Sequence, residues 1–288
     1  LGATTAETQS QLALTETGNK IVDRQSEVMV TGKDGKMSIQ SNGDITVKAA
    51  NVKSTGTIDV NAKGKLLVGT EKQSSKEHYD FSDNHHYHLD KEGEVGSVIG
   101  GKDGVRLVGQ TEATLRQAEV TSANGKVMVA SKGDVRIEEG RYIEHLDTRN
   151  KQKSRGAFTS VTEEYKHKHN YDLSKGSEID GNSVVIYSQD GNVTVQGSNV
   201  VGENGLTVKA KTIDIKEAEN KVYSDDFHSK KKSGVLGGGI GVTFGAQKQT
   251  IESDKTKFYA QGSQVGSLNG NTTLIAENDY TQTASHVS

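Results

Sequence analysis

The sequence predicts an all-β fold of the β-solenoid type, in which short strands coil around one thin core. Three observations support this class: a repeated segment, short strands that alternate apolar with polar residues, and a chain of 288 residues with no proline. Average usage would give a chain of this length roughly fourteen prolines. Because proline cannot donate to a β-ladder, its absence suits a fold built almost entirely of paired strands.

The repeat is a short segment that ends in a small residue, any residue and valine. It occurs at Ile39–Val52 (IQSNGDITVKAANV), Leu107–Val120 and Leu274–Val287, and with one inserted residue at Ile186–Val200. The intervals between the closing valines are long and unequal. A constant segment at variable spacing indicates an internal repeat interrupted by inserts.

A second pair of strands follows the repeated segment. GTIDVNAKGKLLV from Gly56 aligns with GKVMVASKGDVRI from Gly125, and a shorter version begins at Gly205. Runs such as Ile58-Asp59-Val60 show the period-two alternation of half-buried strands, and the Gly-containing pairs between them suit tight corners. A thin core of stacked Val, Ile and Leu also explains how a chain with only 31% hydrophobic residues can fold.

Three polar inserts, at about 69–95, 140–175 and 218–261, interrupt the coil. Each rejoins it at a Gly-Ser pair, which begins at Gly96, Gly176 or Gly262. The remaining residues make about eight turns at ~22 residues per turn, with ~4.8 Å between neighbouring strands. The inserts are too long for corners, so we expect hairpin-like arms that stand off the rod.

Composition excludes several function classes. The 35 basic and 38 acidic residues nearly cancel, so the basic footprint of a nucleic-acid binder is missing. Absence of cysteine excludes disulfides and thiol catalysis. No apolar run reaches ~20 residues and no signal peptide opens the chain at Leu1. We interpret residues 1–288 as a single repeat segment of a larger protein.

Units of the form NGDITVKAANV…GTIDVNAKGKLLV, followed by Lys- and Ser-rich inserts such as EKQSSKEHYDF, resemble the haemagglutinin repeats of filamentous haemagglutinin-like exoproteins. The resemblance covers nearly the whole chain. It implies a right-handed parallel β-helix, export through an outer-membrane two-partner-secretion transporter in a Gram-negative bacterium, and a secreted, surface-attached location.

The family includes adhesins and effectors of contact-dependent growth inhibition. The Lys-Ser insert and the glycine-rich run DFHSKKKSGVLGGGIGVTFG resemble the repeat region that assists toxin delivery in the effectors. The resemblance therefore implies a structural and translocation segment that contacts the target-cell outer membrane or a surface receptor. The alternative is an adhesin shaft that attaches to host or neighbouring cells. No nucleic-acid partner and no cofactor is expected.

Histidines are the strongest candidate chemistry in the chain. HYDFSDNHHYHLD at 78–90 holds four of the nine histidines, and EYKHKHNY repeats the alternation in the second insert. Stacked arms could bring His86, His88, His167 and His169 together as a zinc or copper site or a pH-sensitive contact. The alternative, which we favour, is an amphipathic hairpin face with no metal.

Two further patterns are weaker. Alternation of Ile240, Val242 and Phe244 within residues 234–246 could line a membrane-spanning hairpin, although the run is shorter than such a strand requires. Parallel β-helices also include polysaccharide lyases and glycosidases, and adjacent acids occur at 138–139, 163–164 and 225–226. Because neighbours on a strand point to opposite faces, these pairs do not form a catalytic dyad by themselves. We therefore predict no enzymatic activity and no catalytic residues.

Overall fold

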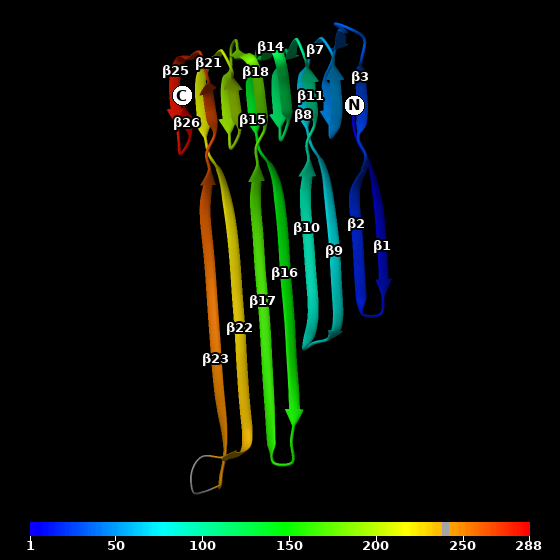
Figure 1. The fold of residues 1–288 in the computed structure, drawn as a ribbon, viewed down its shortest axis with the longest axis vertical. Coiled ribbons are helices and arrows are strands. Elements are labelled where there is room, and N and C mark those ends of the chain that lie inside the picture. Colours follow the sequence, from blue (N-terminus) through cyan, green and yellow to red (C-terminus); the bar gives the residue numbers. More distant parts are fainter. Residues whose placement is uncertain (238–241) are drawn as a thin grey trace.

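The computed structural model describes residues 1–237 and 242–288, and every regular element within them is a β-strand. The strands form two connected bodies, a short rod and a set of long hairpins that hang from one side of it (Figure 1). We call them the rod and the hairpin sheet. The predicted all-β class is confirmed. No helix in the described ranges is long and apolar enough to span a membrane.

The rod consists of short strands that pair only in parallel. These are β3 (Ser26–Val30), β4 (Met37–Ser41), β5 (Ile45–Lys48), β6 (Ala50–Ser54), β7 (Thr57–Ala62), β8 (Lys65–Gly69), β11 (Val98–Gly101), β12 (Gly104–Gly109), β13 (Glu112–Arg116), β14 (Glu119–Ser131), β15 (Asp134–Glu138), β18 (Glu178–Ser188), β19 (Asn192–Gln196), β20 (Asn199–Gly202), β21 (Gly205–Lys216), β24 (Gln264–Ser267), β25 (Asn271–Gln282) and β26 (His286–Val287).

Stacked columns of apolar side chains run the length of the rod. One column joins, by strand pairing, Val28, Val52, Ile99, Val120, Ile179, Val200, Val265 and Val287. All four closing valines of the sequence repeat lie in this column, so the repeat marks equivalent positions in successive layers. This long parallel pairing is the arrangement of a β-helix.

The core is thin and apolar because alternate residues of each strand point inward. Ile58 is 1% exposed, and Leu107 and Ile186 are fully buried. Burying a side chain of this size contributes about 1.5–3 kcal/mol, and each one touches the layers above and below. A narrow core of such columns is what the modest hydrophobic content of the chain can build.

Within the described residues, the hairpin sheet contains eight strands in four hairpins, and every pairing between them is antiparallel. The strands are β1 (Thr4–Leu12), β2 (Thr15–Arg24), β9 (Glu71–Ser82), β10 (His85–Val95), β16 (Gly140–Arg155), β17 (Thr159–Lys175), β22 (Ala218–Gly237) and β23 (Val242–Gln261). Three of these hairpins lie within the segments 69–95, 140–175 and 218–261 that the sequence marks as inserts. The pair β1–β2, which precedes the first rod strand, is a fourth hairpin that the sequence did not indicate.

Each layer of the rod has a corner along the same edge, and a hairpin is inserted at this corner in every second layer. A hairpin precedes β3, β11, β18 and β24, whereas a plain corner of one to three residues precedes β6, β14, β20 and β26. Each plain corner contains one residue with a positive φ between 44° and 54°, namely Ala49, Gln117, Gly197 or Ala284. At this corner of the rod, each layer without a hairpin thus turns through a left-handed residue.

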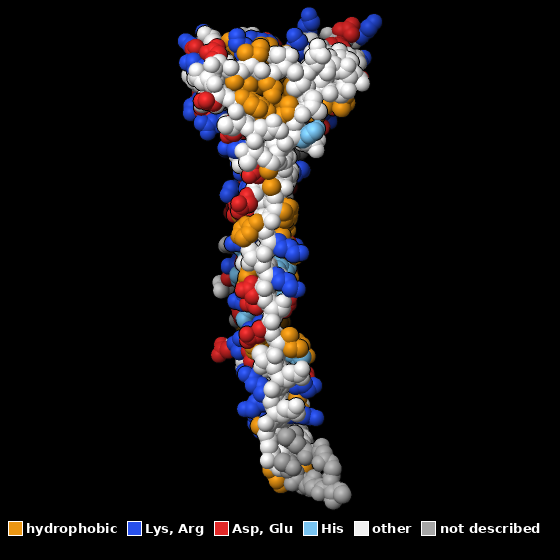
Figure 2. All heavy atoms as spheres, turned by 90° about the vertical axis from the view of Figure 1, so that its left-hand side faces the viewer, with side chains coloured by type: hydrophobic (Ala, Val, Ile, Leu, Met, Phe, Trp, Pro, Cys, Tyr) orange, Lys and Arg blue, Asp and Glu red, His pale blue; other side chains and the backbone are white. Residues whose placement is uncertain are grey.

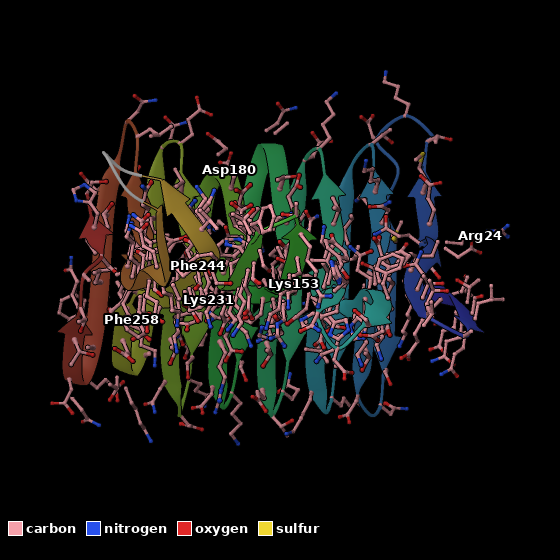
Figure 3. The ribbon with its side chains drawn as sticks, turned by 90° about the horizontal axis from the view of Figure 1, so that it is seen from below. Arg24, Lys153, Asp180, Lys231, Phe244 and Phe258 are labelled. Atoms are coloured by element: carbon pink, nitrogen blue, oxygen red, sulfur yellow. The ribbon has the colours of Figure 1, made fainter. Side chains whose placement is uncertain are left out.

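Because of this alternation, the spacing of the hairpins in the hairpin sheet matches the spacing of the layers in the rod. The two strands of one hairpin occupy about twice the ~4.8 Å strand spacing, which equals the rise of the two rod layers between hairpins. Neighbouring hairpins therefore fall at pairing distance, and they join into one sheet in the order β1-β2-β9-β10-β16-β17-β22-β23. Figure 3, seen from below, shows the rod strands in a row, with Arg24 at one end and Phe258 toward the other.

Candidate functional site: the hairpin sheet

The hairpins project far beyond the rod and lengthen along the chain. β22 and β23 each have 20 residues, which span about 65 Å at the rise of an extended strand. Most described side chains of the sheet are exposed or half-buried, so it has no hydrophobic core of its own. Backbone ladders, ion pairs and ring contacts hold it together, and both of its broad faces are available for contact.

A serine closes the root of each hairpin, and it is buried in three of the four. The Ser97 hydroxyl donates to the Gly69 carbonyl at 2.8 Å, which joins the residue after the hairpin to the residue before it. Equivalent bonds are Ser177 to Glu138 at 2.8 Å, Ser263 to Lys216 at 2.7 Å, and Ser26 to Gly2. The Gly-Ser pairs seen in the sequence are therefore root clamps.

The glycine before the serine is needed for a close approach. A Cβ on Gly96 would lie 1.8 Å from the Gln117 carbonyl oxygen, and one on Gly176 would lie 2.1 Å from that of Gly197. In both cases the crowding group is the left-handed corner residue of the next layer. Hairpin corners and plain corners are thus packed directly against each other.

A second contact fixes the root of the β9–β10 hairpin. Glu94 accepts hydrogen bonds from Arg116 at 2.8 and 2.6 Å and from Thr70 at 2.5 Å. Its side chain is only 6% exposed. Burial alone would raise the pKa of Glu94, but the bonds from Arg116 and Thr70 lower it below its usual value. An ionised, bidentate pair therefore ties this hairpin to the rod.

Three histidines gather on one face of the β9–β10 hairpin. The His78 and His88 ring centroids are 4.4 Å apart, and those of His86 and His88 are 4.8 Å apart. Nε2 of each ring bonds a carboxylate, in the pairs His78–Asp90 at 3.0 Å, His86–Asp147 at 3.2 Å and His88–Asp80 at 2.7 Å.

One of these pairs, His86–Asp147, crosses from the second hairpin to the third. Burial opposes ionisation of Asp147, but hydrogen bonds from Lys168 and His86 hold its pKa below the usual value. The carboxylate therefore contacts a cation and an imidazole at a junction between hairpins.

His167 and His169 of the third hairpin lie on the opposite face. His167 Nδ1 is 2.6 Å from Asp226, and His169 Nε2 is 2.8 Å from Glu144. Because cross-strand partners share a face, the pairs His86↔Arg149 and Thr148↔His167 put His86 and His167 on different sides of the sheet.

The predicted convergence of four imidazoles is therefore not formed. The sequence separation between the two histidine pairs is one residue longer than the separation between the rejoining glycines, Gly96 and Gly176. A shift of one residue along a strand moves a side chain to the other face of the sheet. Within residues 1–237 and 242–288, no group of three or more His, Asp or Glu side chains has a metal-holding arrangement.

Most of the adjacent acids named in the sequence engage basic partners rather than each other. Glu163 pairs with Lys230 at 2.5 Å, and Glu164 pairs with Arg149 at 2.7 Å. Glu139 approaches Arg141 at 3.8 Å, and burial raises the pKa of this carboxyl. These acids act as parts of ion pairs on the sheet and at its root.

Large apolar side chains are exposed near the hairpin ends. They include Leu12 (73% exposed), Phe81 (63%), Phe158 (75%) and Phe244 (75%), so each hairpin carries at least one. The predicted alternating run at 234–246 includes residues 238–241, among them Ile240, which lie outside the described residues. Phe244 is the part of that pattern that can be placed.

The sequence also matches known proteins. A family model described as a hemagglutinin repeat matches residues 9–86 and 158–288, which is more than half of the chain. The chain belongs to the hemagglutinin repeat family. The resemblance noted in the sequence is thereby confirmed.

Curated relatives are the much longer CdiA proteins. The chain is 31% identical over 165 residues to the tRNA nuclease CdiA of Yersinia mollaretii, which covers 51% of this chain and 5% of that protein. It is 25% identical over 255 residues to the tRNA nuclease CdiA-2 of Burkholderia pseudomallei, covering 85% of this chain and 8% of that protein. The chain thus spans less than a tenth of either relative. No solved structure matches it significantly.

Proposed function

We propose that this hemagglutinin repeat segment assists delivery of a toxin into target bacteria during contact-dependent growth inhibition. The observation that carries the proposal is the hairpin sheet, in which four hairpins are fixed to one rod by serine hydrogen bonds and pair side by side through their backbones. A plain shaft does not require such projections. The relatives named as CdiA nucleases support the same role.

In this proposal the rod is a right-handed coil of about eight turns, as ~22 residues per turn and the strand spacing suggest. Residues 1–288 are one repeat segment of a larger exported protein, in which the rod is a spacer. An outer-membrane two-partner-secretion transporter exports that protein, and it stays attached to the cell surface. Its contacts are the target-cell outer membrane or a surface receptor, and not nucleic acid.

We propose that the segment itself is not an enzyme. The nuclease activity named for the relatives would reside outside the small part of their length that aligns with this chain. The ion-paired state of Glu163 and Glu164 supports this view, because a retaining dyad needs two carboxyls ~5 Å apart across a substrate groove.

The second candidate is an adhesin shaft. The continuous parallel ladder from β3 to β26 favours it, because such a rod can hold a distant binding domain away from the cell surface. In that case the hairpins would contribute to attachment rather than to delivery.

Deletion of inserts 69–95, 140–175 and 218–261 in the full-length protein separates the two roles. Target-cell binding and toxin activity inside the target are measured independently. The delivery role predicts normal binding with toxin activity lost. Loss of binding itself would favour the adhesin.

A further inference from the structure

A row of four polar side chains crosses three strands on one face of the hairpin sheet. Glu144 lies on β16, His167 and His169 lie on β17, and Asp226 lies on β22. Glu144 Oε1 is 2.8 Å from His169 Nε2, and His169 Nδ1 is 3.4 Å from His167 Nε2. His167 Nδ1 is in turn 2.6 Å from Asp226 Oδ1. Every ring nitrogen of the two histidines is therefore used, and the row joins the third hairpin to the fourth.

The carboxyl groups at both ends of the row are held in the ionised form. Burial opposes ionisation of Glu144, but hydrogen bonds from Tyr142 and His169 bring its pKa below the usual value. A hydrogen bond from His167 likewise lowers the pKa of Asp226. Because an ionised carboxylate only accepts hydrogen bonds, neither end supplies a proton to the row.

The row needs one more proton than two neutral imidazoles carry. Each of its three contacts requires one proton between the two heavy atoms. A neutral imidazole has a single N–H, so two neutral rings provide two protons for three contacts. Without a third proton, two lone pairs would face each other at one of the contacts. One of the two rings is therefore an imidazolium, and its charge lies between two carboxylates.

The three histidines gathered on the other face need no additional proton. His78, His86 and His88 each contact one carboxylate through Nε2, and a neutral ring with its proton on Nε2 satisfies that contact. Figure 2 views the hairpin sheet from its β23 edge and shows histidine side chains on both sides of it. The two groups of histidines thus occupy separate environments, and only the row on β17 requires a charged ring.

Other titratable side chains on the same face surround the row. Strand register places these groups on that face: Tyr87 and Lys91 from β10, Tyr142 from β16, Glu163, Tyr165 and Tyr171 from β17, His228 and Lys230 from β22, and Lys255 and Lys257 from β23. Lys230 pairs with Glu163, whereas Lys91 lies 3.6 Å from Glu144 and the charge of Lys255 acts on Asp226. These lysines compete with the imidazolium for the two carboxylates. We therefore expect the proton to strengthen the junction several-fold rather than by orders of magnitude.

We propose that His167 and His169 share one bound proton that fastens the third hairpin to the fourth, so that this junction tightens as the pH falls and loosens as it rises. Imidazole gains and loses its charge between about pH 5 and 8. The closed row holds the proton more tightly than separated side chains do, so acid stabilises the junction until the two carboxyls themselves take up protons. This switch goes beyond the delivery role and does not depend on it.

Hydrogen exchange of the purified chain between about pH 6 and about pH 9, in the presence of a metal chelator, tests the switch. The measured quantity is the protection of β17 and β22 amides around the His167↔Asp226 pair, divided by that of β10 and β16 amides around the His86↔Arg149 pair. The division cancels the direct effect of pH on exchange. The ratio should be several-fold higher at the acid end of the range. An equal ratio at all pH values would overturn the proposal.

Asp226→Asn is the informative variant, because its amide donates to His167 Nδ1 where the carboxylate accepts. Two neutral rings then satisfy all three contacts, so the junction should keep its protection at alkaline pH and lose its tightening in acid. Asp147→Asn makes the same substitution at the His86 contact between the second and third hairpins and should keep the parent's pH dependence. Acid tightening that persists in Asp226→Asn, or that disappears in Asp147→Asn, would contradict the shared proton.

Nitrogen NMR of the chain with ¹⁵N-labelled histidine counts the protons directly, since protonated and unprotonated ring nitrogens differ in chemical shift. At about pH 7.5, where a free imidazole is mostly neutral, His167 and His169 together should show three protonated nitrogens in the parent. They should show two in Asp226→Asn. Two protonated nitrogens in the parent, or three in the variant, would overturn the proposal.

Discussion

Removal of the Ser177 hydroxyl tests the root clamps. Ser177 is fully buried, donates to the Glu138 carbonyl at 2.8 Å and accepts from the Ala118 N–H at 3.0 Å. Ser177→Ala leaves a buried donor and a buried acceptor without this partner. One such group costs about 1–3 kcal/mol, so we expect a loss of roughly 2–3 kcal/mol at this root.

Native-state hydrogen exchange is the suitable assay, because a repeat rod need not unfold in a single step. The Ala118 amide should exchange about 30-fold faster or more, since each ~1.4 kcal/mol is a factor of ten. Ser154→Ala, on an exposed part of the third hairpin, is the control and should leave that amide unchanged. Unchanged protection of Ala118 in Ser177→Ala would refute the clamp.

Three further predictions concern stability. Arg116→Ala should cost roughly 3 kcal/mol in denaturant unfolding, because it removes the only cation that is hydrogen-bonded to the buried carboxylate of Glu94 through its side chain among the described residues. The pKa of Glu94 is lower in the folded protein than in the unfolded chain, so the Glu94–Arg116 pair stabilises the fold at pH values above the unfolded pKa. This stabilisation is lost as the pH falls through the folded pKa. If the free energy of unfolding depended on acid pH in the same way in Arg116→Ala and in the parent, that would contradict this prediction. Leu107→Ala should cost about 2–5 kcal/mol through a cavity in the core, and a cost below about 1 kcal/mol would show that this column is not tightly packed. Gly176→Ala should lower the melting temperature, because its Cβ would lie 2.1 Å from the Gly197 oxygen; a melting temperature equal to the parent's would mean that the next layer can move away.

The rod could be predicted from the sequence because the pattern that defines each layer lies within one short segment of the chain. Alternation marks the inward residues, and the closing valines that repeat along the chain lie in one column of the structure. Stacking identical positions needs no knowledge of distant contacts. Pattern reasoning therefore recovered the class and the position of the core.

The first hairpin was missed because its return lacks the Gly-Ser signal. Ser26 follows Gln25, whereas the other three returning serines follow glycine. A better signal is a serine two positions before a residue of the valine column. All four hairpin roots share it, in the pairs Ser26/Val28, Ser97/Ile99, Ser177/Ile179 and Ser263/Val265. That pattern also includes Ser198, so it identifies candidate roots and does not separate them from plain corners.

The face on which each histidine lies depends on whether it is an even or an odd number of residues from the hairpin root, and not on the approximate distance along the chain. His86 is ten positions before Gly96, and His167 is nine before Gly176. Approximate repeat spacing was enough to predict that the arms stack, but a single position decides the face. The hydrogen-bonded register of β10 on β16 and of β16 on β17 supplies that information.

The most direct test of the delivery role replaces hairpins with the plain corners that the rod already uses. In the full-length protein, residues 70–96 are replaced by one alanine, as at Ala49, and residues 139–176 and 217–262 by one glycine each, as at Gly197. The rod ladder then remains continuous. The account predicts that target-cell binding stays at the parent level while toxin activity inside the target is lost. Toxin activity at the parent level in cells that bind this variant would contradict it.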